Sequence, residues 1–116
     1  MKYLFLLYGD EVAEAALTAE ERRAIVDAHR GFHGRLEERG ALVRGEPLNG
    51  RSAAFTIRYG SGARPIVTDG PFAETKEQLG SYYVVQCEDR AEAESIAREI
   101  PASPGLVVEA RAIDDM

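Results

Sequence analysis

Apolar and polar residues follow two different periodicities along this sequence, and these periodicities predict which segments are helices and which are strands. Apolar residues recur at spacings of three and four in residues 19–39 and 89–100, as is typical of helices with one buried face. Short apolar or alternating runs, which are typical of strands, occupy residues 2–8, 41–46, 52–59, 65–68, 81–87 and 106–113. This order of elements indicates an α+β protein.

The first helix has clear boundary signals. Thr18 and Glu21 have the T-x-x-E spacing of a capping box, and Gly40 is placed to end the helix in the left-handed conformation. The apolar stripe of this helix is predicted to consist of Ile25, Ala28, Phe32 and Leu36. The second helix is predicted to begin after Asp89 and to end before Pro101.

Residues 52–59 and 65–68 are predicted to form a hairpin that reverses at Gly60-Ser61-Gly62. Residues 2–8 and 81–87 have apolar side chains on both faces, whereas two helices cover only one face of a sheet. The other face needs a second cover, and another copy of the chain is the simplest candidate. We therefore expect one domain of residues 1–116 with a ferredoxin-like antiparallel sheet, two helices on one face, and assembly as a homodimer.

The amino-acid composition limits which binding partners and which cellular compartment are expected. The 116 residues are 45% hydrophobic and 29% charged, as suits one folded domain. Fourteen basic and twenty acidic residues give a net charge of -6, and no basic patch stands out, so no direct nucleic-acid partner is expected. Residues 3–8 are too short an apolar run for a signal peptide or a membrane span. With its single Cys87, the chain is expected to be cytoplasmic, without a membrane partner.

The segment from Asp69 to Gly80 concentrates turn residues and ionisable side chains between two apolar strands. A connector between paired strands usually needs about two to five residues, so this longer segment predicts a site. The segment begins with Asp69-Gly70-Pro71-Phe72 and continues through Glu74, Thr75, Lys76, Glu77, Gln78 and Gly80. This run closely resembles the signature of the DGPF group of YCII-related proteins, which is named after its first four residues. The resemblance extends over nearly the whole chain and implies a dimeric α+β barrel, in which two sheets pack face to face.

Two histidines, His29 and His33, lie one turn apart on the first helix, with His29 at the edge of its apolar face. Some YCII-related proteins have a proposed His-Asp pair, and their histidine precedes the helix-ending glycine by a distance similar to that between His29 and Gly40. The resemblance thus implies an acid-base role for His29, with Asp69 as the natural partner. The alternatives are that His29 is a boundary residue of an amphipathic helix and that Asp69 is a turn residue capping nearby amides.

Gly70, Phe72, Lys76 and Tyr83 are the predicted ligand contacts. Gly70 turns the backbone, Phe72 offers a ring for stacking and Lys76 offers a charge for an anionic group. The alternatives are a core position for Phe72 and a solvated surface position for Lys76. Strong metal, phosphate-loop or dinucleotide signatures are absent from the sequence, so no metal and no cofactor are predicted.

The leading hypothesis is a small-molecule-binding enzyme that uses His/Asp acid-base chemistry of the lyase, isomerase or hydrolase type. The alternative is a non-catalytic binding or regulatory module, because relatives of the DGPF group occur beside or fused to extracytoplasmic-function sigma factors. An enclosed polar pocket built by His29 and the Asp69 to Gly80 segment would favour the enzyme, whereas a segment that only packs as structure would favour the module.

Overall fold

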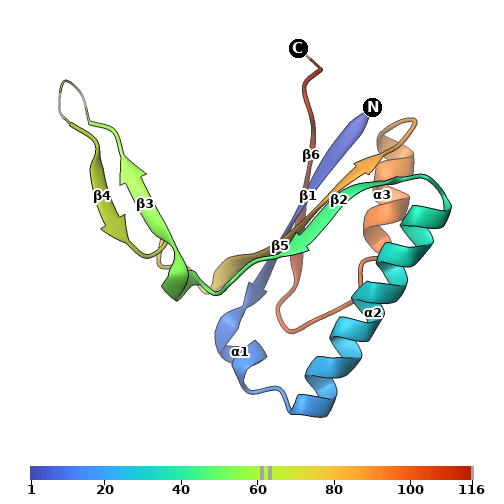
Figure 1. Cartoon of the computed structure of the whole chain (residues 1–116), viewed down its shortest axis with the longest axis horizontal. Helices are drawn as coiled ribbons and strands as arrows, with labels where there is room; N and C mark the ends of the chain where they lie inside the picture. Colours follow the sequence, from blue (N-terminus) through green and yellow to red (C-terminus); the bar gives the residue numbers. More distant parts are fainter. Residues whose placement is uncertain (61, 63, 116) are drawn as a thin grey trace.

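The computed structural model describes residues 1–60, 62 and 64–115. Its main sheet has four antiparallel strands in the order β2-β5-β1-β6, and strands β3 and β4 form a separate two-stranded sheet (Figure 1). The strands are β1 (Lys2–Asp10), β2 (Leu42–Pro47), β3 (Phe55–Arg58), β4 (Ile66–Asp69), β5 (Glu77–Gln86) and β6 (Val107–Ala112). The helices are α1 (Glu11–Ala15), α2 (Ala19–Glu38), the short 3-10 helix η1 (Arg51–Ala53) and α3 (Arg90–Arg98).

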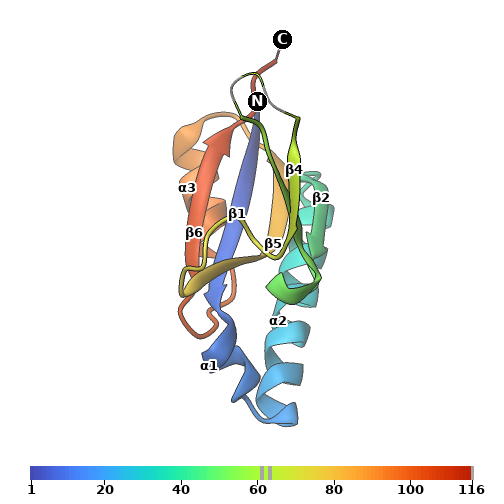
Figure 2. The ribbon, with the colours of Figure 1, turned by 90° about the vertical axis from the view of Figure 1, so that its left-hand side faces the viewer.

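The main sheet and the two longer helices confirm the ferredoxin-like prediction. Helices α2 and α3 lie side by side on one face of the sheet (Figures 1 and 2). The two central strands, β1 and β5, are those whose sequences are apolar on both faces. No helix among the described residues is both long enough and apolar enough to cross a lipid bilayer.

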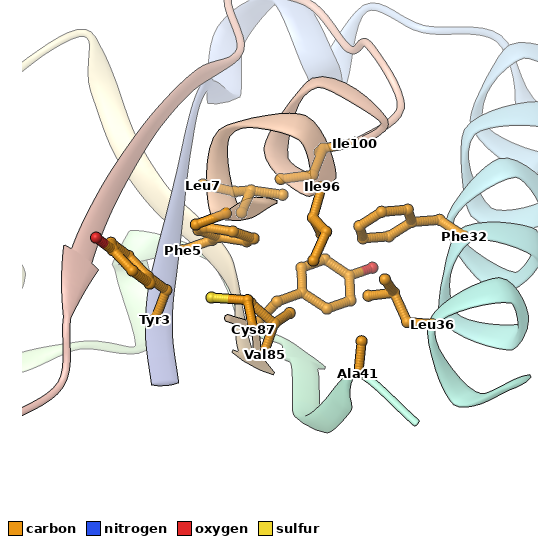
Figure 3. Packing of buried hydrophobic residues seen from close by; sticks show 12 residues of the cluster. Tyr3, Phe5, Leu7, Phe32, Leu36, Ala41, Val85, Cys87, Ile96 and Ile100 are labelled. Carbon is orange, nitrogen blue, oxygen red and sulfur yellow. The ribbon is translucent and has the colours of Figure 1, made fainter. Parts of the chain in front are cut away.

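Alternation along β1 separates the two faces of the sheet. Its odd-numbered residues enter the core against α2 and α3, where Phe5 is fully buried (Figure 3). Its even-numbered residues, such as Leu4 and Leu6, are only partly buried on the opposite face. The helices of one chain therefore cover one face, and the other apolar face stays open in the single chain (Figure 1).

Helix α2 begins and ends as predicted. The Glu21 amide donates to Thr18 Oγ1 (3.0 Å) and the Thr18 amide donates to Glu21 Oε1 (2.9 Å), which completes the capping box. Gly40 has a φ of 68°, and the Ala41 amide donates to the Leu36 carbonyl. This left-handed turn ends the helix and leads the chain into β2.

The predicted apolar stripe of α2 needs one correction. Ala28 is exposed, whereas His29 is half-buried beside the fully buried Phe32. Ile25, His29, Phe32 and Leu36 follow one another at spacings of four, three and four residues. These positions form a narrower stripe on the helix than the series that contains Ala28 instead of His29. His29 therefore takes the inward position that the sequence pattern assigned to Ala28.

The hairpin of β3 and β4 forms, but it does not join the main sheet. We call residues 55–69 the arm; it projects on the side of the sheet opposite the helices (Figures 1 and 2). The predicted reversal at Gly60-Ser61-Gly62 includes Ser61, which lies outside the described residues. The exposed fraction is between 43% and 80% for the large apolar residues of the arm, which are Phe55, Ile57, Tyr59, Ile66 and Val67. The arm thus adds apolar surface that the chain itself does not cover.

Candidate functional site

A cavity of about 810 Å³ lies between the main sheet and the N-terminal half of α2. Helix α1 and the segment that follows β2 complete its wall. Its apolar lining includes Leu7, Ile25 and Leu106, and its polar lining includes His29 and Tyr83. A space of this size and mixed character suits a small organic molecule.

The central contact of the cavity joins His29 on α2 to Tyr83 on β5. His29 Nδ1 and the Tyr83 hydroxyl are 2.8 Å apart, and the two rings are parallel to within 6°. Phe32, one helical turn from His29, meets the Tyr83 ring edge to face at 90° with ring centroids 5.1 Å apart. Since Phe32 is fully buried, the rings of Tyr83 and His29 rest on a rigid part of the core.

Gly45 on β2 makes room for Tyr83. The two residues are directly paired in the antiparallel register, and a Cβ atom on Gly45 would overlap the Tyr83 ring. A glycine inside a strand commonly marks such a close approach. This glycine is the sequence signal from which the position of Tyr83 could have been inferred.

We expect Gly45→Ala to destabilise the protein by about 1–3 kcal/mol, because the new methyl group forces the Tyr83 ring to move. Urea denaturation measures the cost, and the imidazole NMR signals of His29 report the displaced ring. Gly34→Ala on α2 is the matched control, since a Cβ there meets nothing within 4 Å, and it should stabilise by about 0.5–1 kcal/mol. Equal stability of the Gly45→Ala variant and the wild type would contradict the packing argument.

Burial shifts both members of the pair toward their neutral forms. It lowers the pKa of His29 from its usual 6.5 and raises the pKa of Tyr83 from its usual 10.0. At neutral pH the imidazole is therefore uncharged with one N–H, and the phenol keeps its proton. Either group can donate the hydrogen bond that joins them.

Carboxylates line the end of the cavity formed by α1. Burial, followed by the charges of Glu11 and Asp10, raises the pKa of Glu14. Glu11 holds the segment that follows β2 against α1. Its Oε1 accepts a hydrogen bond from the Arg51 amide (2.9 Å), and its Oε2 lies 3.5 Å from Arg51 Nε. Arg22 lines the same end, and its Nη2 donates to the Leu17 carbonyl (3.1 Å), so this end of the cavity carries charges of both signs.

The structure does not bring Asp69 to His29 within one chain. Asp69 is the last residue of β4, is exposed, and pairs in register with Phe55 across the arm. The arm and α2 lie on opposite sides of the main sheet (Figure 1), and Asp69 is absent from the cavity lining. The sequence pattern placed Asp69 at the end of a strand correctly, but it did not show that this strand leaves the main sheet.

Gly70, Phe72 and Lys76 also lie away from the cavity wall. Gly70 has a φ of 96°, and its carbonyl accepts from the Thr56 hydroxyl (2.8 Å) at the base of the arm. The Phe72 side chain is 75% exposed, and Lys76 Nζ lies 3.6 Å from Asp10 Oδ2. Of the four predicted ligand contacts, only Tyr83 lies on the cavity wall.

The end of the predicted loop is part of β5 and reaches the cavity. Gln78 is buried, and its amide nitrogen donates to the carbonyls of Ala73 (3.2 Å) and Thr75 (2.8 Å). Gln78 and Gly80 line the cavity, whereas the carbonyls of Gly70 and Phe72 accept hydrogen bonds from Thr56 and Arg58 of the arm. The segment therefore contributes both to the cavity and to the structure of the arm.

His33, one turn after His29, also lines the cavity, and its Nε2 lies 3.7 Å from Glu37 Oε1. Within the described part of the chain, no three side chains of histidine, cysteine, aspartate or glutamate gather closely enough to hold a metal ion.

The fold and cavity define a ferredoxin-like α+β protein, and comparison with known proteins identifies its family. The sequence matches the YCII-related domain over residues 1–116. It is also 37% identical, over 100 residues, to an uncharacterised protein of Rhizobium meliloti (strain 1021). The aligned region covers 86% of this chain and 80% of the relative. The chain belongs to the YCII-related family.

Proposed function

We propose that this YCII-related protein is an enzyme that binds a small molecule in the cavity and uses His29 as its acid-base group. The observation that carries the proposal is the half-buried imidazole on the cavity wall, hydrogen-bonded through Nδ1 to Tyr83. A neutral imidazole held in a fixed orientation can accept a proton at one stage of a reaction and return it at another. Lyase, isomerase and hydrolase reactions all use such a step.

The sequence of the segment from Asp69 to Gly80 supports the assignment of this protein to the DGPF group of the family. The role of this segment in the proposal is mainly to hold the arm and to supply Gln78 and Gly80 to the cavity. Asp69 has no part in the acid-base unit of one chain, and Tyr83 takes the place that Asp69 had in the hypothesis drawn from the sequence.

Small-molecule binding is tested by adding a library of neutral fragments to protein labelled with ¹³C in its histidines. We expect bound fragments to shift the imidazole signals of His29. His29→Gln should keep fragment affinity within about tenfold, because the cavity walls remain, while any turnover found falls by about 10²–10⁴-fold. If no fragment shifts the His29 signals, the cavity is not a ligand site. If fragments bind but no turnover depends on His29, the binding or regulatory module becomes the better description.

We also propose that the protein acts as a homodimer. Its accessible surface is 8181 Å², whereas a compact monomer of 12.7 kDa exposes about 6,200 Å². Its radius of gyration is 16.2 Å, against about 13 Å for a compact chain of this length. The surplus, about 2,000 Å² per chain, exceeds the roughly 800 Å² that each partner buries in an interface of standard size.

The surplus apolar surface lies in two places, the open face of the main sheet and the arm. Leu4, Leu6 and Val84 contribute to the open face. On the arm, strand alternation and register place Phe55, Ile57 and Val67 on one face. An isolated two-stranded hairpin is marginally stable in water, so an arm of this composition needs cover. A second copy, with its sheet facing the first, supplies apolar surface for both regions.

A further inference from the structure

The paired groups of the cavity each keep an unused hydrogen-bonding position. Among the described residues, the only hydrogen-bond partner of the Tyr83 hydroxyl is His29 Nδ1, and His29 Nε2 has no partner. A phenol offers one donor and two acceptor positions, and a neutral imidazole has one donor nitrogen and one acceptor nitrogen. Each group can thus bond to its neighbour and also to a ligand.

Two neutral arrangements of the pair are consistent with this geometry. In the first, Nδ1–H donates to the Tyr83 oxygen, which leaves a lone pair on Nε2 and a phenol proton for the ligand. In the second, the phenol donates to Nδ1, which leaves a proton on Nε2 and a lone pair on the phenol oxygen. The pair therefore offers one donor and one acceptor in both arrangements, with their places exchanged. Neither arrangement places a net charge in the half-buried site.

We propose that Tyr83 and His29 act as one bifunctional pair that catalyses keto–enol tautomerisation of a neutral carbonyl compound in the cavity. This inference rests on the proposed function and specifies its substrate class and its second catalytic residue. Nε2 removes a proton from the carbon beside the carbonyl, and the electrons of that C–H bond form a carbon–carbon double bond. The carbonyl oxygen takes the phenol proton as its double bond to carbon becomes single, and the proton on Nδ1 passes to the phenol oxygen.

The products are an enol and the second arrangement of the pair, so all atoms and charges are accounted for. The reverse transfers return a proton from Nε2 to carbon and restore the first arrangement. If this proton returns to a different carbon of a conjugated substrate, the net result is an isomerisation. No oxidant, reductant or second substrate takes part in these steps.

The walls of the cavity specify the remainder of the substrate. Leu7, Ile25 and Leu106 provide apolar surface for an aliphatic or aromatic group. The end formed by α1 carries the Arg22 guanidinium as well as the Glu11 and Glu14 carboxyls, so it selects neither sign of charge. The uncharged pair of His29 and Tyr83 provides no positive charge for a carboxylate bonded to the reacting carbonyl. We therefore expect a neutral ketone or aldehyde with an apolar substituent to be preferred over a keto acid.

The test is the exchange of the CH₂ protons of phenylacetone for deuterium in D₂O, followed by ¹H NMR. Phenylpyruvate, which has a carboxylate in place of the methyl group of phenylacetone, is the charged comparison probe. The variants are Tyr83→Phe, which removes only the hydroxyl, and His29→Gln. Tyr82→Phe is the matched control, because its hydroxyl bonds to Glu46 (2.6 Å) and Tyr82 lies outside the cavity lining.

We expect the wild type to accelerate exchange in phenylacetone more than in phenylpyruvate. Tyr83→Phe and His29→Gln should each lower kcat by about 10²–10⁴-fold with little change in KM, while Tyr82→Phe keeps the wild-type rate. Loss of activity in His29→Gln with activity retained in Tyr83→Phe overturns the bifunctional pair but leaves His29 as the acid-base group. If fragments bind at His29 but the wild type exchanges neither probe, the tautomerisation is wrong and the proposed binding site stands. Both proposals fail if neither binding nor exchange is found.

Discussion

Phe32→Ala is expected to lower the free energy of unfolding by about 3–5 kcal/mol, because it removes a fully buried ring from the centre of the core. Domains of this kind have total stabilities of about 5–15 kcal/mol, so the variant approaches the limit of folding. The loss also removes the edge-to-face contact with Tyr83. Urea denaturation measures the change, and the NMR signals of His29 report whether Tyr83 stays in place.

Phe72→Ala is the matched control, since the Phe72 side chain is 75% exposed. In the monomer it should change stability by no more than about 0.5 kcal/mol. If Phe72 contacts a second subunit, a further cost should appear at concentrations where the dimer is populated and should vanish as the protein concentration falls below the dissociation range. Equal costs for Phe32→Ala and Phe72→Ala, independent of concentration, would show that Phe32 is not the centre of the core.

Val84→Asp is expected to weaken self-association by at least about 30-fold, because each unpartnered polar group that is buried costs about 1–3 kcal/mol and a homodimer buries two of them. Val84 pairs in register with Leu4 on β1 and lies on the face of the sheet that carries no helix. The folded chain should tolerate the change, since this face is only partly buried in the single chain. Sedimentation equilibrium at micromolar concentrations measures the dissociation constant, and circular dichroism checks the fold.

Val12→Asp introduces the same side chain at a position that is 75% exposed. Val12 belongs to α1, a helix that lies beyond the end of β1 and away from the open face of the sheet (Figure 1). We expect this variant to associate as the wild type does. A wild-type chain that remains monomeric at these concentrations, or a Val84→Asp variant as dimeric as the Val12→Asp control, would remove the open face from the proposed interface.

The parts of the fold that could be predicted are those controlled by local chemistry. The capping box of Thr18 and the left-handed Gly40 determine where α2 begins and ends, and both are visible in the sequence. Helix α1 has only five residues, too few for a periodic pattern to predict it. The sequence does not predict that the arm lies apart from the main sheet, because alternation shows that a strand has an apolar face but does not show what covers that face.

The candidate site depends on contacts between distant parts of the chain. His29 and Tyr83 were both identified as candidates from the sequence, but they are 54 residues apart and nothing in the pattern joined them. The sequence favours Asp69 as the partner of His29, because an aspartate at the end of a strand can point into a cleft. That inference required β4 to belong to the main sheet, whereas β4 pairs only with β3. The glycine at position 45 was the available signal for Tyr83, since it reports where another side chain approaches the backbone.

The arm is an insertion within a hairpin. Strands β2 and β5 are antiparallel neighbours, and Pro47 pairs with Ser81, so the chain leaves and re-enters the main sheet at adjacent points. For ends already held together, each doubling of the length of the connecting segment costs only about 0.6 kcal/mol. Evolution can therefore lengthen, shorten or rebuild the arm while β2 and β5 keep Gly45 against Tyr83. The arm can thus vary in length and sequence without disturbing the packing around Tyr83.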